Sequence, residues 1–268
     1  MSFFKKIFSS IGIGSAKVDT ILLCEQLVPG DNIDVIVKIM GGNTQQQIEG
    51  LYFTINSTYL DTMNVTEYDD DEYESSEEEF TRTAIIEKYK VSDKFIIEPG
   101  ETKEIPLTFQ LPYYTPLTLG DTEVWIHTGL DIKKAKDPTD NDYIEVVPGE
   151  MVSALFDAIS ELGFELSEVE CVTISDGFEK ELPFVQEFEF KPLSGHFRNK
   201  VDEVEFVCFP SEDSVEVYME IDRKARGISG HFAELMGRDE TNINFTFEKD
   251  EISNLSNIIF EILDNWVN

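Results

Sequence analysis

The sequence predicts a mainly β protein made of two tandem β-sandwich domains, and three observations support this fold class. Apolar and polar residues alternate along many short segments, as in residues 215–222 and 243–248, which is typical of half-buried antiparallel strands. Gly, Pro and Asn turns separate the segments at short intervals, a spacing that favours a sandwich over a βαβ sheet. The 268 residues are enough for two domains with sizeable cores.

Strands are expected in both halves of the chain, each with one apolar face. In the second half, Phe184, Phe188 and Phe190 alternate with glutamates, as do Val204 and Phe206. This period of two places the apolar side chains on one face and the glutamates on the other. The other expected strands are residues 31–40, 48–60, 81–89, 102–111 and 122–132.

Three Pro-Gly pairs punctuate the chain. Pro29-Gly30 and Pro99-Gly100 precede strands and suit type II turns, whereas Pro148-Gly149 precedes a segment of helical period. That segment, residues 151–162, stops at Gly163, which fits the residue after a helix C-terminus. The change of period predicts domains at residues 1–147 and 148–268.

The end of the chain predicts an amphipathic helix over residues 252–266, with Asp250 as its N-cap. Its apolar stripe is expected to pack on its own domain. The alternative is that it covers a second subunit, which would make the protein a homodimer.

The first residues also have an apolar face, over residues 3–11, with two lysines on the polar side. The favoured interpretation is a short helix against the first sandwich. The alternative is peripheral membrane contact. No stretch is long enough for a transmembrane segment, and no signal peptide is recognised.

The charge excludes whole classes of partner. Lys and Arg number 21 against 54 Asp and Glu, so the formal net charge is −33, which argues against nucleic-acid binding. The run at residues 67–79 is expected to be a solvated loop. The alternative is an interaction segment, with Glu77, Glu78 and Glu79 recruiting a basic partner or loosely binding cations.

Motifs for catalysis or cofactor binding are lacking, so the sequence predicts no cofactor and no enzyme. The three histidines form no zinc pattern, and neither a hydrolase elbow nor a phosphate-binding glycine loop occurs. Cys24, Cys171 and Cys208 form no CxxC pair. They are expected to be free thiols, buried at Cys24 and Cys208, in a reducing cytoplasm.

Two local clusters are candidates for binding. Asp137, Asp140 and Asp142 offer oxygen ligands for calcium, although the EF-hand pattern fails and Asx turns explain the same residues. The second is a cluster of three basic residues in an otherwise acidic chain, at positions 223, 224 and 226. Arg223, Lys224 and Arg226 would either pair with nearby acids or dock an acidic peptide or subunit.

Several long stretches resemble a known family. They are the opening MSFFKKIFSSIGIGSAKVDT, the VPGD turn with DVIVKIMGGNTQQQIEGLY, LPYYTPLTLGDTEVWIHTGLDI, PFVQEFEFKP, DEVEFVCFP and IDRKARGISGHFAELMGRDETN. Together they resemble the bacterial sporulation-control family, the M member of the stage-zero sporulation proteins, over essentially the whole chain. The resemblance implies two arrestin-like β-sandwiches and a cytoplasmic regulatory protein without a known catalytic site.

Two function classes follow. The first is a non-catalytic regulator or scaffold that controls sporulation or development through protein contacts, with a basic partner expected for the acidic insert. The second is a metal- or carboxylate-dependent hydrolase, which convergent acids of perturbed pKa in a cleft would favour.

Overall fold

The computed structural model describes residues 14–69, 72–91, 94–133, 135–174, 181–222 and 242–267. The chain forms two compact units of three segments each. The first unit contains Met1–Ser57, Ile85–Pro112 and Glu123–Val146, and the second contains Thr58–Ala84, Tyr113–Thr122 and Val147–Asn268. The longest segment of the second unit begins at Val147, and the division into domains at residues 1–147 and 148–268 stays a prediction.

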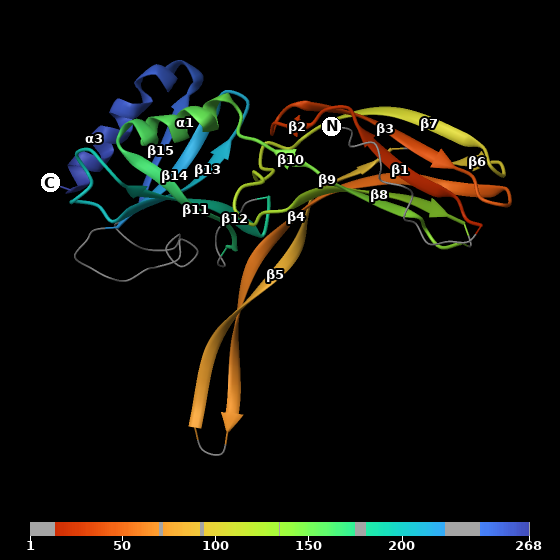
Figure 1. The fold of residues 1–268 in the computed structure, drawn as a ribbon, viewed down its shortest axis with the longest axis horizontal. Coiled ribbons are helices and arrows are strands. Elements are labelled where there is room, and N and C mark those ends of the chain that lie inside the picture. Colours follow the sequence, from red (N-terminus) through yellow and green to blue (C-terminus); the bar gives the residue numbers. More distant parts are fainter. Residues whose placement is uncertain are drawn as a thin grey trace. The chain divides into compact units, whose positions relative to one another are not determined.

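The first unit holds two sheets (Figure 1). One contains β1 (Lys17–Leu22), β3 (Asn32–Met40) and β7 (Thr102–Gln110), all antiparallel. The other is built on β4 (Gln46–Asp69), β8 (Val124–Ile132) and β9 (Thr139–Tyr143), and β5 (Glu72–Lys90) and β6 (Phe95–Ile97) also pair with β4. The far parts of the β4–β5 hairpin, from residue 58 to residue 84, belong to the second unit. A short parallel pair joins β2 (Gln26–Leu27) to β10 (Glu145–Val146).

The two sheets of this unit share an apolar core. The inward residues of β3 alternate along the strand as predicted, and Val37 and Ile39 are fully buried. Phe53 of β4 stacks on Phe109 of β7 at 5.9 Å between ring centroids. These contacts make the sheets a sandwich-like pair and confirm the mainly β fold class.

Among its described residues, the second unit has five strands paired in antiparallel order and the helices α1 and α3 on one face of them (Figure 1). Its strands are β11 (Phe164–Thr173), β12 (Phe184–Pro192), β13 (Glu203–Pro210), β14 (Ser214–Asp222) and β15 (Asn242–Glu248). Its helices are α1 (Glu150–Glu161) and α3 (Leu255–Val267), with η1 (Lys249–Asn254) leading into α3. Phe156 of α1 contacts the rings of three sheet phenylalanines, Phe188, Phe190 and Phe206.

The helix ends agree with the predicted periodicity, except for one cap. Gly163 follows α1 with φ of 92°, as predicted for a helix stop. The prediction of Asp250 as an N-cap was wrong, because a 3₁₀ turn starts earlier and its N-cap is Glu248, in a capping box with Glu251. Three residues of α3, Leu255, Ile259 and Leu263, are buried in this chain. The predicted packing of the C-terminal helix on its own domain is therefore confirmed.

The acidic run did not turn out to be a loop. Residues 67–69 belong to β4 and residues 72–79 belong to β5, and these two strands pair with each other. Strand pairing uses backbone N–H and C=O groups, which acidic residues carry like any others, so a high charge does not prevent it. Within the described part of the chain, no helix is long and apolar enough to cross a membrane.

Candidate functional site

Two of the three predicted calcium ligands accept hydrogen bonds from backbone N–H groups of the first unit. Asp137 accepts a hydrogen bond from the backbone N–H of Ile132, an earlier residue, at 2.8 Å, so this bond is not an Asx turn, in which the N–H comes from a residue further along the chain. Asp140 accepts one from the Thr20 backbone N–H at 3.0 Å. Among the described residues, the three aspartates do not bring their oxygens together within 4.8 Å as a metal-binding set would.

The other predicted interaction residues are only partly covered. Arg223, Lys224 and Arg226 lie outside the described residues, as do residues 3–11. Glu77, Glu78 and Glu79 lie on β5, and Glu78 and Glu79 are exposed. Their roles stay predictions.

The cysteines are free, as expected, but of the two predicted to be buried Cys208 is half-buried and Cys24 is exposed. Cys24 is exposed, because it lies beyond the end of β1, where the chain has left the sheet. Burial raises the pKa of Cys171 to about 12 and that of Cys208 to about 12. Neither thiol is therefore activated as a nucleophile.

The most unusual arrangement is a row of four glutamates across strands β11 to β14 of the second unit, called here the glutamate row. Residue pairing places Glu168 of β11 opposite Glu189 of β12, Glu189 opposite Glu205 of β13, and Glu205 opposite Glu220 of β14. The neighbouring residues Phe188, Phe190 and Phe206 face α1. Because side chains alternate along a strand, the glutamate row lies on the face away from that helix.

More acids flank the row. Glu170 pairs with Glu187, and Glu203 pairs with Asp222. Like charges directly opposite one another destabilise a sheet. Alternation in each strand predicted the glutamates on one face, but only the strand register aligns them in a row.

This crowding shifts the protonation of the central acids. Burial raises the pKa of Glu187 to about 8, and repulsion from Glu170 and Glu220 adds to the shift. Burial likewise raises the pKa of Glu205 to about 8, with further repulsion from four acids, Glu187 first. These two carboxyls therefore hold protons near neutral pH, which relieves part of the repulsion.

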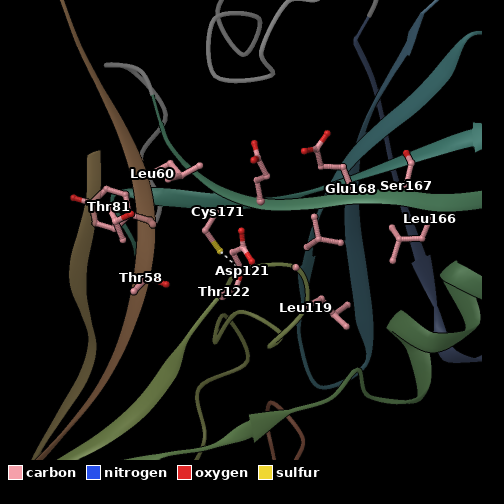
Figure 2. A pocket seen from close by; sticks show the side chains of 14 residues that line it. Thr58, Leu60, Thr81, Leu119, Asp121, Thr122, Leu166, Ser167, Glu168 and Cys171 are labelled. Atoms are coloured by element: carbon pink, nitrogen blue, oxygen red, sulfur yellow. Dashed lines mark hydrogen bonds between the residues drawn. The ribbon is translucent and has the colours of Figure 1, made fainter. Parts of the chain in front are cut away.

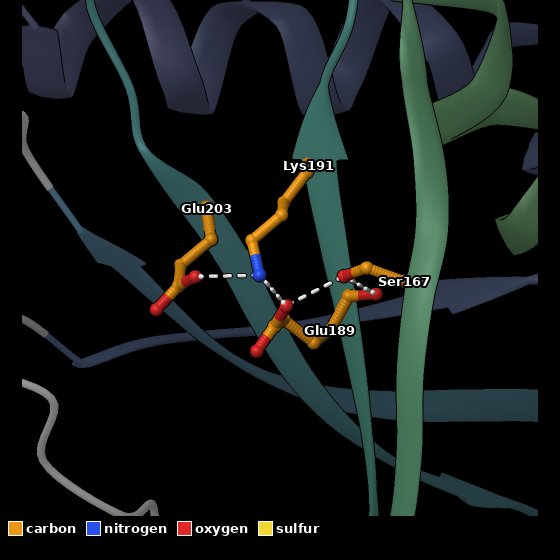
Figure 3. Close-up of polar contacts among 4 residues, drawn as sticks. All are labelled: Ser167, Glu189, Lys191 and Glu203. Carbon is orange, nitrogen blue, oxygen red and sulfur yellow. Dashed lines mark hydrogen bonds and ion pairs between the residues drawn. The ribbon is translucent and has the colours of Figure 1, made fainter. Parts of the chain in front are cut away.

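Lys191 of β12 lies within the acidic face (Figure 3). Its Nζ is 2.5 Å from Glu189 Oε1 and 3.5 Å from Glu203 Oε2, and Ser167 donates a second bond to Glu189 at 2.6 Å. Burial raises the pKa of Glu189, but the hydrogen bonds from Lys191 and Ser167 outweigh burial and lower it overall. Glu189 therefore stays charged at neutral pH.

Three carboxylates converge beside this lysine. Oxygen atoms of Glu189, Glu203 and Glu205 lie within 4.8 Å of one another, the one such group of acids, histidines or cysteines among the described residues. Oxygen ligands in this number suit a hard cation. The Lys191 ammonium already neutralises two of the three.

A pocket of about 450 Å³ opens beside the sheet, within the second unit (Figure 2). Its walls are residues 58–60 of β4, Thr81 of β5, the loop 119–122 and residues 166–171 of β11. Glu168 and Glu170 line it, whereas Glu189, Glu203 and Glu205 do not. The converging carboxylates therefore lie outside the pocket.

Comparison with known proteins gives consistent matches. A family model described as SpoOM protein matches residues 4–225. The chain is similar to the sporulation-control protein spo0M of Bacillus subtilis (strain 168), with 38% identity over 269 residues and 99% of each sequence covered. It is also similar to the crystal structure of Spo0M from Bacillus subtilis, with a TM-score of 0.81 and 36% identity, covering 95% of this chain and 100% of that one.

Proposed function

Because the chain belongs to the SpoOM protein family, we propose that it is a cytoplasmic regulator of sporulation that acts through protein contacts and not through catalysis. The relative of 38% identity is named a sporulation-control protein, which supports the regulatory role. Binding to other proteins is the mechanism that best fits the acidic sheet face of the second unit.

The observation that carries this proposal is the glutamate row. Four glutamates lie in register on one sheet face, where Glu168 is exposed, Glu189 and Glu205 are half-buried and Glu220 is buried, so the acidic surface that meets solvent is at the Glu168 end of the row. Such a surface attracts cationic segments and repels acidic ones, so it selects partners by charge. The expected partner is a protein with a basic segment.

The test is complementation of sporulation. The chain is expressed in a Bacillus subtilis strain lacking spo0M, and heat-resistant spores are counted. A variant with all four row residues changed to Gln should restore at least tenfold fewer spores than the unchanged chain. A control with Glu→Gln at four exposed positions elsewhere, Glu123, Glu145, Glu165 and Glu212, should match the unchanged chain. Equal restoration by the row variant, with the protein present at equal level, would refute the role of the row.

Other predicted surfaces belong to the same proposal. Arg223, Lys224 and Arg226 would dock an acidic peptide or subunit, and Glu77–Glu79 would recruit a basic partner. Deleting residues 67–79 and replacing the three bases with Ala, each in the complementation assay, separates these surfaces from the glutamate row.

A second candidate is a carboxylate-dependent hydrolase, favoured by the convergence of Glu189, Glu203 and Glu205. Glu205 has the raised pKa of a general acid. Two features oppose it, since Lys191 binds two of the acids and all three lie outside the pocket. Hydrolysis of ester, phosphate or glycoside reporters, with and without Mg²⁺ or Mn²⁺, that is lost in Glu205→Gln would establish the enzyme instead.

A further inference from the structure

The feature that carries a further inference is the outer face of the β4–β8–β9 sheet in the first unit. Phe53 of β4 and Ile126 of β8 are fully buried in the core of the sandwich. Because side chains alternate along a strand, their neighbours Tyr52, Trp125 and His127 lie on the opposite, outer face. All these residues belong to the first unit, whereas the glutamate row belongs to the second.

Four rings follow one another across this outer face. Tyr143 of β9 pairs with Trp125 of β8, and their ring centroids lie 5.8 Å apart. His127 is the next residue of β8 on the same face, and its ring centroid lies 6.3 Å from that of Tyr52. These four residues are called here the aromatic stripe. Tyr143 is 60% exposed and the other three are half-buried, so the stripe is accessible in the described part of the chain.

The rings of the stripe are held in place by their neighbours. An added Cβ at Gly129 would lie 2.2 Å from the Tyr52 ring, so this ring lies against the backbone of the residue with which it pairs. His127 Nδ1 donates a hydrogen bond to Asn141 Oδ1 at 2.6 Å. Side chains that are already fixed lose little conformational entropy on binding. A partner therefore meets a pre-formed row of rings.

The Tyr52 end of the stripe carries negative charge. By alternation, Asp131 follows Gly129 on the outer face of β8, and Asp131 and Asp137 are both exposed. Burial raises the pKa of Tyr52, and repulsion from these two aspartates raises it further, so their charges act on its hydroxyl. Lys88 lies over the face of the ring instead, with Nζ 5.8 Å from the centroid. A partner with a basic residue at the hydroxyl end gains attraction from both carboxylates.

A proline-rich segment fits a row of rings of this kind. In the polyproline II helix, residues on one side recur every three positions, or about 9 Å, and the backbone makes no internal hydrogen bonds. The two ring pairs of the stripe stand about 7 Å apart, since Trp125 and His127 are separated by two strand residues. Aromatic grooves bind such helices because the ligand is already ordered before it binds. A neutral sugar could also stack on the rings, but it would gain nothing from the aspartates.

We infer that the aromatic stripe binds a proline-rich segment of a partner protein in the polyproline II conformation, with a basic residue beside Asp131. The inference goes beyond the proposed function, since it assigns a second contact surface, on the first unit. This surface selects a backbone conformation as well as a charge, which the glutamate row does not.

The experiment uses the full chain and a fluorescein-labelled peptide of eight prolines followed by two arginines, in about 150 mM salt. One twin peptide has alanine in place of every proline, and a second has glutamate in place of both arginines. The alanine twin is not pre-ordered, and the glutamate twin is repelled by the aspartates. Fluorescence anisotropy should show that each twin binds at least tenfold more weakly than the proline–arginine peptide.

Matched variants locate the site on the protein. Tyr143→Ala should weaken binding of the proline–arginine peptide about tenfold, because it removes the most exposed ring of the stripe. Ile85→Ala is the control, since Ile85 of β5 is 59% exposed but shares the parity of Tyr89, whose ring contacts Phe109 in the core. Its affinity should change less than twofold.

The charged end has its own pair of variants. Asp131→Asn should weaken binding of the proline–arginine peptide about fivefold, because one of the two carboxylates that attract the arginines is lost. Asp121→Asn is the control, since Asp121 is also exposed but belongs to the second unit. It should leave the affinity unchanged.

The outcomes separate the inference from the proposed function. Equal binding of the proline and alanine peptides would overturn the inference and leave charge-driven docking on the glutamate row intact. Failure of all three peptides to bind would also overturn it, and the complementation assay then decides the proposed function independently. Equal effects of Tyr143→Ala and Ile85→Ala would overturn the assignment to the stripe. Binding of cellohexaose, a neutral oligosaccharide, without binding of the peptide would show that the stripe recognises a glycan instead.

Discussion

Glu189 of β12 lies directly opposite Glu205 of β13, on the sheet face that points away from α1. The two carboxyls differ in protonation, because Lys191 and Ser167 keep Glu189 charged while burial and neighbouring acids raise the pKa of Glu205 to about 8. Repulsion within the row is therefore reduced, because Glu189 carries a charge while Glu205 holds a proton near neutral pH.

The first prediction concerns the stability of the chain as a function of pH. The pKa values of Glu187 and Glu205 rise from 4.5 to about 8 on folding, so between these values the folded protein binds more protons than the unfolded one. The free energy of unfolding should therefore fall as pH rises through this window, by about 1–2 kcal/mol after allowance for solvent screening. Urea denaturation between about pH 5 and pH 9 measures the profile.

The control for this profile is a matched pair of variants. Glu187→Gln with Glu205→Gln should flatten the decline, whereas Glu212→Gln, at an exposed position in the β13–β14 turn, should leave it unchanged. A wild-type profile that rises across the same window would contradict the proposed sharing of protons.

The second prediction concerns the lysine in the acidic face. Lys191→Met should lower the free energy of unfolding by about 1 kcal/mol, because Glu189 and Glu203 lose their cation while their side chains are only 17% and 19% exposed. Lys249→Met is the control, since its partner Glu150 is 67% exposed and such surface pairs contribute little. Thermal denaturation compares the stabilities of the two variants. Equal losses would mean that Lys191 does not stabilise the acidic face more than a surface ion pair would.

The third prediction concerns a glycine in the first unit. Gly129→Ala should destabilise the protein by about 2–3 kcal/mol, because an added Cβ would lie 2.2 Å from the Tyr52 ring. Gly50→Ala, on the paired strand β4, meets only the flexible end of Lys90 at 3.9 Å and should change stability by less than about 1 kcal/mol. Similar melting temperatures for both variants would show that Tyr52 moves aside without cost.

The fourth prediction concerns the thiols. In native protein at about pH 8, Ellman's reagent should react first with Cys24, because its thiol is exposed, although burial and Asp34 raise its pKa. Cys171 and Cys208, whose pKa values are raised to about 12 by burial, should react only after denaturation. Cys24→Ser should abolish the rapid phase, and its persistence would mean that one of the other two thiols is accessible.

The fold was more predictable from the sequence than the site. Alternation identified strands such as residues 215–222 because one buried face imposes a period of two on the side chains. The glutamate row needed the register between strands, which depends on backbone pairing and a bulge between Leu166 and Glu168. The acidic run could not be recognised as strand from its composition, because strand pairing depends on the backbone and not on side-chain charge. Cys24 follows apolar residues that continue past the end of β1, so its exposure could not be read from its neighbours.

The last prediction concerns the aromatic core beneath the helices. Phe206 is fully buried and contacts Phe188 and Phe190 at 5.6 and 5.2 Å between ring centroids, as well as Phe156 of α1. Phe206→Ala should therefore reduce the free energy of unfolding by about 3–5 kcal/mol, through lost burial and the cavity left behind. Phe80→Ala is the matched control, because Phe80 on β5 is 40% exposed and should lose less than about 1 kcal/mol. Calorimetry of both variants tests this, and a small effect at Phe206 would mean that the helices do not depend on this cluster for their packing on the sheet.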